Sequence, residues 1–162
     1  QHLQDQGFEV RSLNDAGPLD LYIDGADQVL PSLVAIKGGG AAHTSEKVHA
    51  VAAKTFVGMV TSDKVVDEFT WAVPVEVILV ARSSLSRQME GLGWSPKLRE
   101  NVTTDHGNPI LDVSIKSMHD HEGIENQINI MAGVVECGLF ASRKFDRIYV
   151  ASEEEVKVMT PA

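Results

Sequence analysis

The chain places an apolar run directly before two aspartates in Leu19-Asp20-Leu21-Tyr22-Ile23-Asp24-Gly25-Ala26-Asp27. The apolar residues predict a strand. In open α/β sheets, ligands bind in the crevice beyond the carboxyl ends of the strands, which is where Asp24 and Asp27 would lie. Gly25 and Ala26 leave room for a ligand there. A turn between two strands, with Asp27 as a local cap, is an equally good interpretation of these residues taken alone.

A second apolar run, Leu33–Ile36, is followed by the loop Lys37-Gly38-Gly39-Gly40-Ala41-Ala42. Three consecutive glycines let the backbone approach a ligand and direct N–H groups at an anion, while Lys37 adds a point charge. The spacing is neither that of a P-loop nor that of the dinucleotide fingerprint GxGxxG. A flexible loop with an incidental lysine explains the glycines alone equally well.

Two further charged residues belong to the same region. Thr44 is the expected N-cap of a helix, and Glu46 lies in the first turn of that helix, where the helix dipole favours acidic residues in any case. Near Asp24 and Lys37, however, a carboxylate at this position can act as a general base. Lys64 follows the predicted strand Thr55–Val60, and a lone surface lysine is the simplest interpretation of it.

The order of the patterns predicts a Rossmann-like layered α/β domain with an inserted ferredoxin-like lobe. We expect the α/β domain to comprise residues 1–73 and 141–162, with the lobe at residues 74–140. Arg147–Val150 is expected to return to the first sheet, whereas Gln1–Gln6 and Phe8–Val10 read as a helix and a short strand. The lobe's βαββαβ order is predicted from Val75–Val80, Ala81–Leu92, Pro96–Glu100, Pro109–Ile115, Glu122–Met131 and Val134–Phe140.

Composition excludes several functional classes. The 162 residues are 43% hydrophobic and 23% charged, which is typical of a globular protein, and no stretch is apolar enough to span a membrane. A formal net charge of −9 disfavours nucleic-acid binding. Cys137 is the only cysteine, so no internal disulfide forms and a cytoplasmic location is expected. His119 and His121 lack further ligands at metal spacing, and we expect neither a metal nor a cofactor.

Together, in this order and spacing, the motifs resemble type A ribose-5-phosphate isomerases over essentially the whole chain. The stretches that carry the resemblance are 19–27, Ile36-Lys37-Gly38-Gly39-Gly40-Ala41-Ala42, Glu46-Lys47, Ser62-Asp63-Lys64, Pro74-Val75-Glu76-Val77, Ala81-Arg82, Thr104-Asp105-His106-Gly107-Asn108, Ile110-Leu111-Asp112 and Gly133-Val134-Val135-Glu136-Cys137-Gly138-Leu139-Phe140.

This resemblance implies a metal-free isomerase that interconverts ribose 5-phosphate and ribulose 5-phosphate in the pentose phosphate pathway, as a homodimer or homotetramer. It implies that the Asp24–Asp27 and Lys37–Gly40 stretches bind substrate, that Glu46 is the proton acceptor and that Lys64 binds substrate. Lys37 would stabilise the enediolate oxygen, and Asp24 and Asp27 would handle hydroxyl protons.

The family's N-terminal strand and its hydroxyl- and glycine-rich phosphate loop have no counterpart in the sequence, so we expect a longer parent protein. Two other functions remain open. A non-catalytic sugar-phosphate sensor would not need a glutamate base beside a lysine, and a nicotinamide-dependent dehydrogenase fragment is disfavoured by the missing GxGxxG.

Overall fold

The main sheet positions the candidate site. In the computed structural model, which describes residues 2–161, this sheet has four strands, with β4 between β1 and β10 and both pairs parallel. The fourth strand, β11, pairs antiparallel with β10. Strand β4 buries Phe56, Val57 and Val60, whereas Lys54, Met59 and Thr61 are exposed. The strands are β1 (Leu19–Asp24), β4 (Ala53–Thr61), β10 (Arg147–Ala151) and β11 (Val156–Met159).

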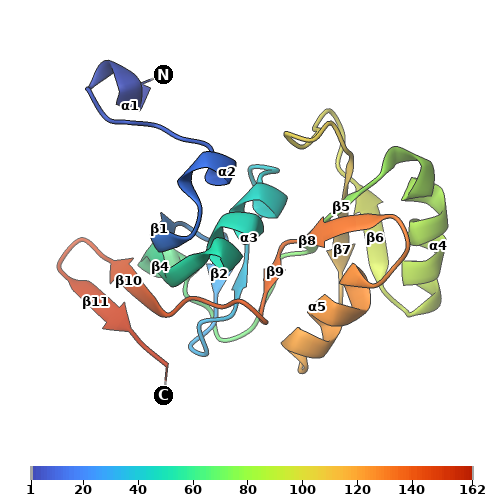
Figure 1. Ribbon diagram of the computed structural model, residues 1–162. Helices are drawn as coiled ribbons and strands as arrows, with labels where there is room; N and C mark the ends of the chain where they lie inside the picture. Colours follow the sequence, from blue (N-terminus) through green and yellow to red (C-terminus); the bar gives the residue numbers. More distant parts are fainter. Residues whose placement is uncertain (1, 162) are drawn as a thin grey trace.

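The connection from β1 to β4 carries the rest of the site. It contains β2 (Gln28–Val29), β3 (Ala35–Ile36) and helix α3 (His43–Ala52), which lies beside the main sheet in Figure 1. Ala50 of α3 is fully buried with Phe56, Phe145 and Ile148 in one of the two apolar cores.

The second lobe, on the right of Figure 1, has the predicted βαββαβ order. Its sheet order is β6-β7-β5-β8 with every neighbouring pair antiparallel, as a split βαβ arrangement requires. Both helices pack on this sheet, and Leu85, Met89 and Ile128 share its core with Val75 and Leu111. The elements are β5 (Val73–Val77), α4 (Arg82–Gly91), β6 (Ser95–Leu98), β7 (Ile110–Ser114), α5 (His121–Asn129) and β8 (Val134–Cys137). The predicted fold class is therefore confirmed.

Gly138 divides what the sequence suggested was one strand, 134–140. The chain leaves the lobe at β8 and enters a separate three-stranded sheet as β9 (Leu139–Phe140), which pairs with β3. The Gly138 carbonyl accepts a hydrogen bond from the Lys37 N–H at 2.8 Å. A Cβ atom at Gly138 would lie 2.0 Å from the Lys37 carbonyl oxygen, so only glycine allows this approach.

Several local predictions were wrong. The N-cap of α3 is Ala42 rather than Thr44, whose hydroxyl instead donates to Glu76. Residues 8–10, predicted as a strand, are exposed coil because no neighbouring strand offers them hydrogen bonds. Strand β5 ends at Val77, and a 3₁₀ turn, Leu79–Ala81, replaces the rest of the predicted strand.

The N-terminal region contains two short helices, α1 (His2–Asp5) and α2 (Leu13–Ala16), of which the second begins after the N-cap Ser12. Position 1 of the predicted first helix lies outside the described residues. Neither these helices nor any other in residues 2–161 is long and apolar enough to cross a bilayer.

One face of the main sheet is uncovered. Leu21, Ile23, Met59, Tyr149 and Val158 each expose more than a third of their surface there. Strand β1 pairs with β4 on one side, and no described strand pairs with its other edge.

Candidate active site

A cleft of about 260 Å³ opens where β1 ends, beside the loop after β3 and the first turn of α3. Asp24 ends strand β1 and is followed by a turn, while Glu46 lies in α3. The fold therefore brings these two residues, 22 positions apart in sequence, into one cleft. Its lining residues are Asp24, Gly25, Ala26, Asp27, Lys37, Gly38, Gly39, Gly40 and Glu46. The structure therefore brings together every residue predicted for the site except Lys64.

Lys37 is the cation at the centre of the cleft, and only 3% of its surface is exposed. Its Nζ lies 3.0 Å from Asp24 Oδ2 and 3.1 Å from Glu46 Oε2, and it also donates to the Gly25 carbonyl. A buried ammonium needs such compensation, because removal from water is costly for a charged group. The cation thus has a fixed position between two carboxylates.

Burial raises the pKa of Glu46 above its ordinary value. Lys37 opposes this effect, and the negative charges of Asp24 and Asp27 add to it. Burial therefore contributes more than the clustering of carboxylates that the sequence suggested. Glu46 Oε2 is buried and accepts no well-aligned hydrogen bond from residues 2–161, although Lys37 is close. A raised pKa suits a group that removes a proton from carbon.

Asp24 is fixed by two hydrogen bonds. The Tyr22 hydroxyl donates to Asp24 Oδ2 at 2.6 Å, and the Gly25 N–H donates to Oδ1 at 2.8 Å. Burial and the neighbouring Asp24 raise the pKa of Tyr22, which keeps its hydroxyl protonated as a donor. Sequence reasoning missed Tyr22, although positions two apart on a strand share a face.

Asp27 anchors the glycine loop. Its Oδ2 accepts a hydrogen bond from the Gly39 N–H at 2.7 Å, and a Cβ atom at Gly39 would lie 2.7 Å from Oδ1. Gly38 has a φ of +113°, a conformation that other residues rarely adopt. The glycines therefore allow the loop to pass directly over the Asp27 carboxylate.

Lys64 lies apart from this cleft, at the end of the 3₁₀ turn Ser62–Lys64. Its Nζ is 3.6 Å from Asp63 Oδ2 and 5.9 Å from the centre of the Trp71 ring, and about a third of its side chain is exposed. Its role in substrate binding stays a prediction.

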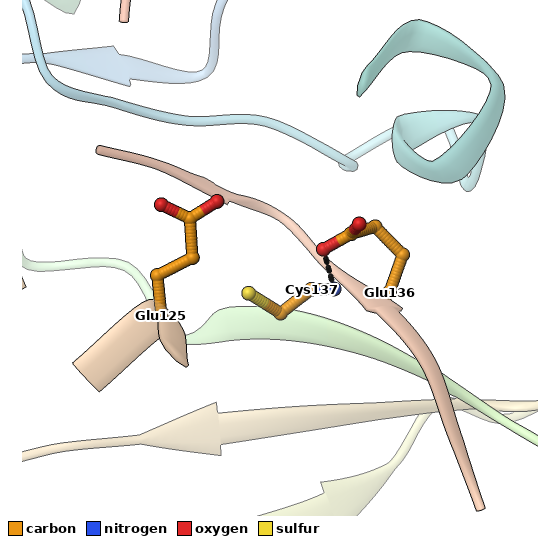
Figure 2. Close-up of side chains that lie close together, drawn as sticks. All are labelled: Glu125, Glu136 and Cys137. Carbon is orange, nitrogen blue, oxygen red and sulfur yellow. Dashed lines mark hydrogen bonds between the residues drawn. The ribbon is translucent and has the colours of Figure 1, made fainter. Parts of the chain in front are cut away.

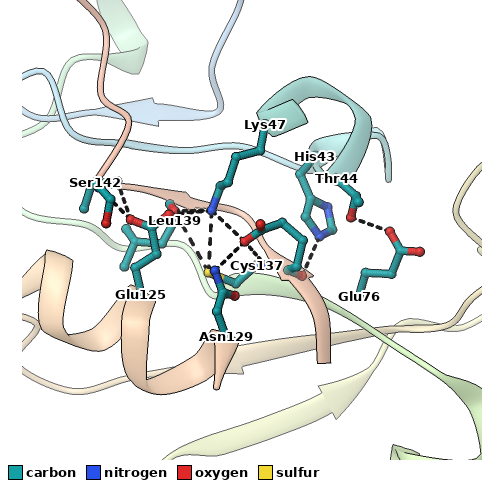
Figure 3. A network of polar contacts seen from close by, with 11 residues as sticks. His43, Thr44, Lys47, Glu76, Glu125, Asn129, Cys137, Leu139 and Ser142 are labelled. Carbon is teal, nitrogen blue, oxygen red and sulfur yellow. Dashed lines mark hydrogen bonds and ion pairs between the residues drawn. The ribbon is translucent and has the colours of Figure 1, made fainter. Parts of the chain in front are cut away.

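Helix α3 is anchored on its other side by Lys47, the neighbour of Glu46 (Figure 3). Lys47 Nζ lies 2.6 Å from Glu125 Oε1, 2.9 Å from Glu136 Oε1 and 2.7 Å from the Leu139 carbonyl oxygen. Burial lowers the pKa of Lys47, but the carboxylates of Glu136 and Glu125 outweigh this effect and raise it. The ion pairs join α3 to α5 and β8.

Glu125, Glu136 and Cys137, shown in Figure 2, are the one group in residues 2–161 whose ligand atoms are close enough together to hold a metal ion. Lys47 Nζ lies beside all three and is 3.9 Å from Cys137 Sγ. Burial raises the pKa of Cys137 to about 11, so its thiol stays protonated at neutral pH. The ammonium supplies the positive charge that a metal would otherwise bring.

A second network holds the first turn of α3. Glu76, on β5, accepts hydrogen bonds from Thr44, Thr104 and Asn108, and Figure 3 shows the Thr44 contact. His43 Nε2 lies 3.2 Å from the Glu136 carbonyl oxygen, and burial lowers its pKa to about 4. Both networks tie the helix that carries Glu46 to the ferredoxin-like lobe.

Comparison with known proteins agrees with this geometry. The family described as ribose 5-phosphate isomerase A (phosphoriboisomerase A) matches residues 1–155. The ribose-5-phosphate isomerase A of Histophilus somni (strain 2336) is 49% identical over 157 residues, which are 95% of this chain and 71% of that relative. That of Haemophilus influenzae (strain 86-028NP) is 46% identical over 159 residues, 97% of this chain and 73% of the relative.

Solved structures extend the likeness. The crystal structure of ribose 5-phosphate isomerase A from Neisseria gonorrhoeae superposes with a TM-score of 0.95 at 39% identity, covering 99% of this chain and 72% of that one. A D-ribose-5-phosphate isomerase in complex with phospho-erythronic acid gives a TM-score of 0.92 at 33% identity, covering 97% of this chain and 72% of that one. The chain therefore belongs to the ribose 5-phosphate isomerase A family and is an aldose–ketose isomerase.

Proposed function

We propose that this chain interconverts D-ribose 5-phosphate and D-ribulose 5-phosphate through an enediolate, with Glu46 as the base that moves the proton. The observation that carries the proposal is the pairing of Glu46, whose pKa is raised by burial, with Lys37 Nζ 3.1 Å away. A base and a fixed cation side by side can remove a proton from carbon while stabilising the charge that develops on the adjacent oxygen. The reaction belongs to the non-oxidative pentose phosphate pathway.

In the aldose-to-ketose direction, Glu46 removes the proton from C2 of the open-chain sugar and returns it to C1, while the C2 hydroxyl gives up its proton and the C1 oxygen gains one, so that the product has a carbonyl at C2 and a hydroxyl at C1. The electron pair released at C2 forms the C1–C2 double bond, and the former carbonyl oxygen on C1 becomes negatively charged. Lys37 lies where it can stabilise that charge. Because the ammonium is already held by Asp24 and Gly25, little reorganisation is needed when the charge appears.

The two aspartates differ in what their contacts leave free. Both oxygens of Asp24 already accept hydrogen bonds, from Tyr22 and the Gly25 N–H, which suits a group that orients a sugar hydroxyl. Asp27 uses Oδ2 to hold the Gly39 N–H, so Oδ1 is the oxygen through which it can exchange hydroxyl protons. Substrate is also bound by the backbone of Gly25, Ala26 and the three loop glycines. Lys64, which does not line this cleft, binds it from a neighbouring position.

Phospho-erythronic acid, the ligand of one solved relative, supports the enediolate assignment. It is a sugar acid with a phosphate at one end and a planar, negatively charged carboxylate at the other. That carboxylate resembles the charged enediolate more than it resembles the neutral aldehyde, and an active site complementary to the transition state favours such ligands. The same compound is therefore a suitable probe for this chain.

The test is conversion of ribose 5-phosphate to ribulose 5-phosphate by the purified protein, before and after dialysis against EDTA. We expect turnover that survives dialysis, because Glu46 and Lys37 provide both proton transfer and charge stabilisation. Saturable binding of phospho-erythronic acid without any turnover would favour the sensor interpretation. Activity that disappears on dialysis and returns with a divalent ion would contradict the metal-free mechanism.

We also propose that the protein is a homodimer or homotetramer in the cytoplasm, with the ferredoxin-like lobe, residues 74–140, taking part in assembly. The proposal follows from the type A resemblance of the sequence. Light scattering during size-exclusion chromatography measures the assembled mass, and a monomer at micromolar concentration would contradict it.

A further inference from the structure

Arg99 reaches from the ferredoxin-like lobe to the glycine loop of the cleft. It follows β6, and its guanidinium makes a bidentate ion pair with Asp112, with Nε 2.9 Å from Oδ2 and Nη2 2.5 Å from Oδ1. Its remaining nitrogen, Nη1, donates to the Gly38 carbonyl at 2.8 Å and to the Gly39 carbonyl at 3.3 Å. Only 18% of the Arg99 side chain is exposed, and together with these hydrogen bonds this burial holds the planar guanidinium group in one orientation.

These contacts fix the peptide between Gly38 and Gly39 at both of its ends. Its carbonyl accepts from Arg99 and from the Ala41 N–H at 3.0 Å, and its N–H donates to Asp27 Oδ2. Glycines have more conformational freedom than other residues, so a glycine loop cannot hold its own shape. Arg99 from one side and Asp27 from the other supply the restraint that the sequence of the loop lacks.

The next peptide along the loop offers a free donor. The Gly39 carbonyl faces Arg99, and in a trans peptide the N–H of the following residue points the opposite way. That residue is Gly40, which lines the cleft and whose N–H donates to no acceptor in residues 2–161. The orientation of this N–H depends on the carbonyl that Arg99 holds.

We infer that Arg99, held by Asp112, is a positioning residue that sets the glycine loop so that its backbone N–H groups face the anionic oxygens of the substrate. The inference rests on the proposed function in one respect, the assignment of the glycine loop to substrate binding. It extends that function to the second lobe, since a residue on that lobe orients a wall of the cleft.

The chain contains a matched control arginine. Arg143 also pairs with one carboxylate, Asp146 at 3.0 Å, and donates to backbone carbonyls, those of Ala50 and Ala53 among them. Its side chain is 24% exposed, close to the value for Arg99. Replacement of Arg143 therefore removes a comparable set of structural contacts without touching the glycine loop.

The experiment compares Arg99→Ala with Arg143→Ala by steady-state kinetics, thermal melting and calorimetric binding of phospho-erythronic acid. We expect Arg99→Ala to lower kcat/KM by about 10- to 100-fold, the loss typical of a small misplacement of binding groups. Guanidinium chloride at millimolar concentration should restore part of this loss, because the free ion can occupy the vacated position beside Asp112. Arg143→Ala should lose thermal stability at least equally, with kcat/KM close to wild type and no response to guanidinium.

Equal kinetic losses in the two variants, or an Arg99→Ala enzyme within about twofold of wild type, would overturn the inference. If Arg99→Ala does not fold, Arg99→Lys and Asp112→Asn take its place, and both are expected to show intermediate losses of kcat/KM. The binding measurement distinguishes failure of the positioning role of Arg99 from failure of the proposed function. Wild-type protein without isomerase activity would contradict the proposed function, whereas unchanged phospho-erythronic acid affinity in every Arg99 variant would contradict the positioning role.

Discussion

Replacing Glu46 by glutamine removes one acid–base group and little else. The amide keeps the size of the side chain and retains an oxygen that can face Lys37, at 3.1 Å in the present structure. An amide cannot accept the C2 proton at neutral pH. The replacement also removes a carboxylate whose ionised form is disfavoured by burial, so we expect the free energy of unfolding at neutral pH to change by less than about 1 kcal/mol.

The structure indicates how large the kinetic loss should be. Loss of a general base costs about 10²- to 10⁴-fold in rate, or about 3 to 5 kcal/mol in the activation barrier. A neighbouring carboxylate could reduce this loss only if it were free to take over. Both oxygens of Asp24 accept hydrogen bonds, and Asp27, whose Oδ1 is left for hydroxyl protons, is held against the glycine loop by the Gly39 N–H. We therefore expect the upper half of the range, about 10³-fold or more in kcat, with KM little changed.

Formation of ribulose 5-phosphate by the wild type, Glu46→Gln and Glu122→Gln provides the assay. Glu122 is a matched control, because it lies in the first turn of α5 as Glu46 lies in the first turn of α3, but it is exposed. The control variant should retain wild-type kinetics. If Glu46→Gln kept more than half of the wild-type turnover, Glu46 would not be the base.

The remaining predictions concern charge and stability. Lys37→Ala should lower kcat by about 10²- to 10³-fold and raise KM less, because the cation stabilises charge that develops in the transition state; a change in KM alone would contradict this role. Lys64→Ala should chiefly raise KM, and an effect confined to kcat would show that the roles of the two lysines are wrongly divided. The pH profile of kcat/KM should fall on the acid side through the pKa of Glu46, at a pH above its ordinary value of 4.5, because burial raises that pKa and only the ionised carboxylate is a base. Lys47→Met should lower the free energy of unfolding by about 3 to 5 kcal/mol in urea titrations, since Glu125 and Glu136 would be left without their cation; a loss below about 1 kcal/mol would show that the pair is not stabilising.

The main parts of the site could be predicted because they depend on local rules. Asp24 ends a strand, and Lys37 and the glycines follow another apolar run that ends in a short strand. Glu46 begins the next helix, and the structure brings all of these residues into one cleft. The order of elements also predicted the lobe, since βαββαβ has few compact arrangements.

What the sequence could not indicate depends on contacts between distant segments. Arg99 donates to the Gly38 carbonyl, 61 positions away in sequence. No local sequence pattern predicts which arginine will bind a backbone carbonyl. Thr44 has the residue type of an N-cap, but its hydroxyl donates a hydrogen bond to Glu76, 32 positions away. In the sequence, Gly138 looks like part of one apolar strand. The need for glycine there comes from the Lys37 carbonyl, which only the fold brings close to it. Lys64 follows a predicted strand end but does not line the cleft.

The central claim is that Glu46 moves a proton between C2 and C1, and isomerisation in deuterium oxide tests it most directly. A carboxyl that exchanges its proton with solvent during the lifetime of the enediolate returns deuterium to carbon. Proton and carbon NMR of the sugar phosphates at equilibrium should therefore show deuterium at C1 of ribulose 5-phosphate and at C2 of ribose 5-phosphate with the wild type and Glu122→Gln, but not with Glu46→Gln over the same time. Deuterium incorporation by Glu46→Gln at the wild-type rate would contradict the account.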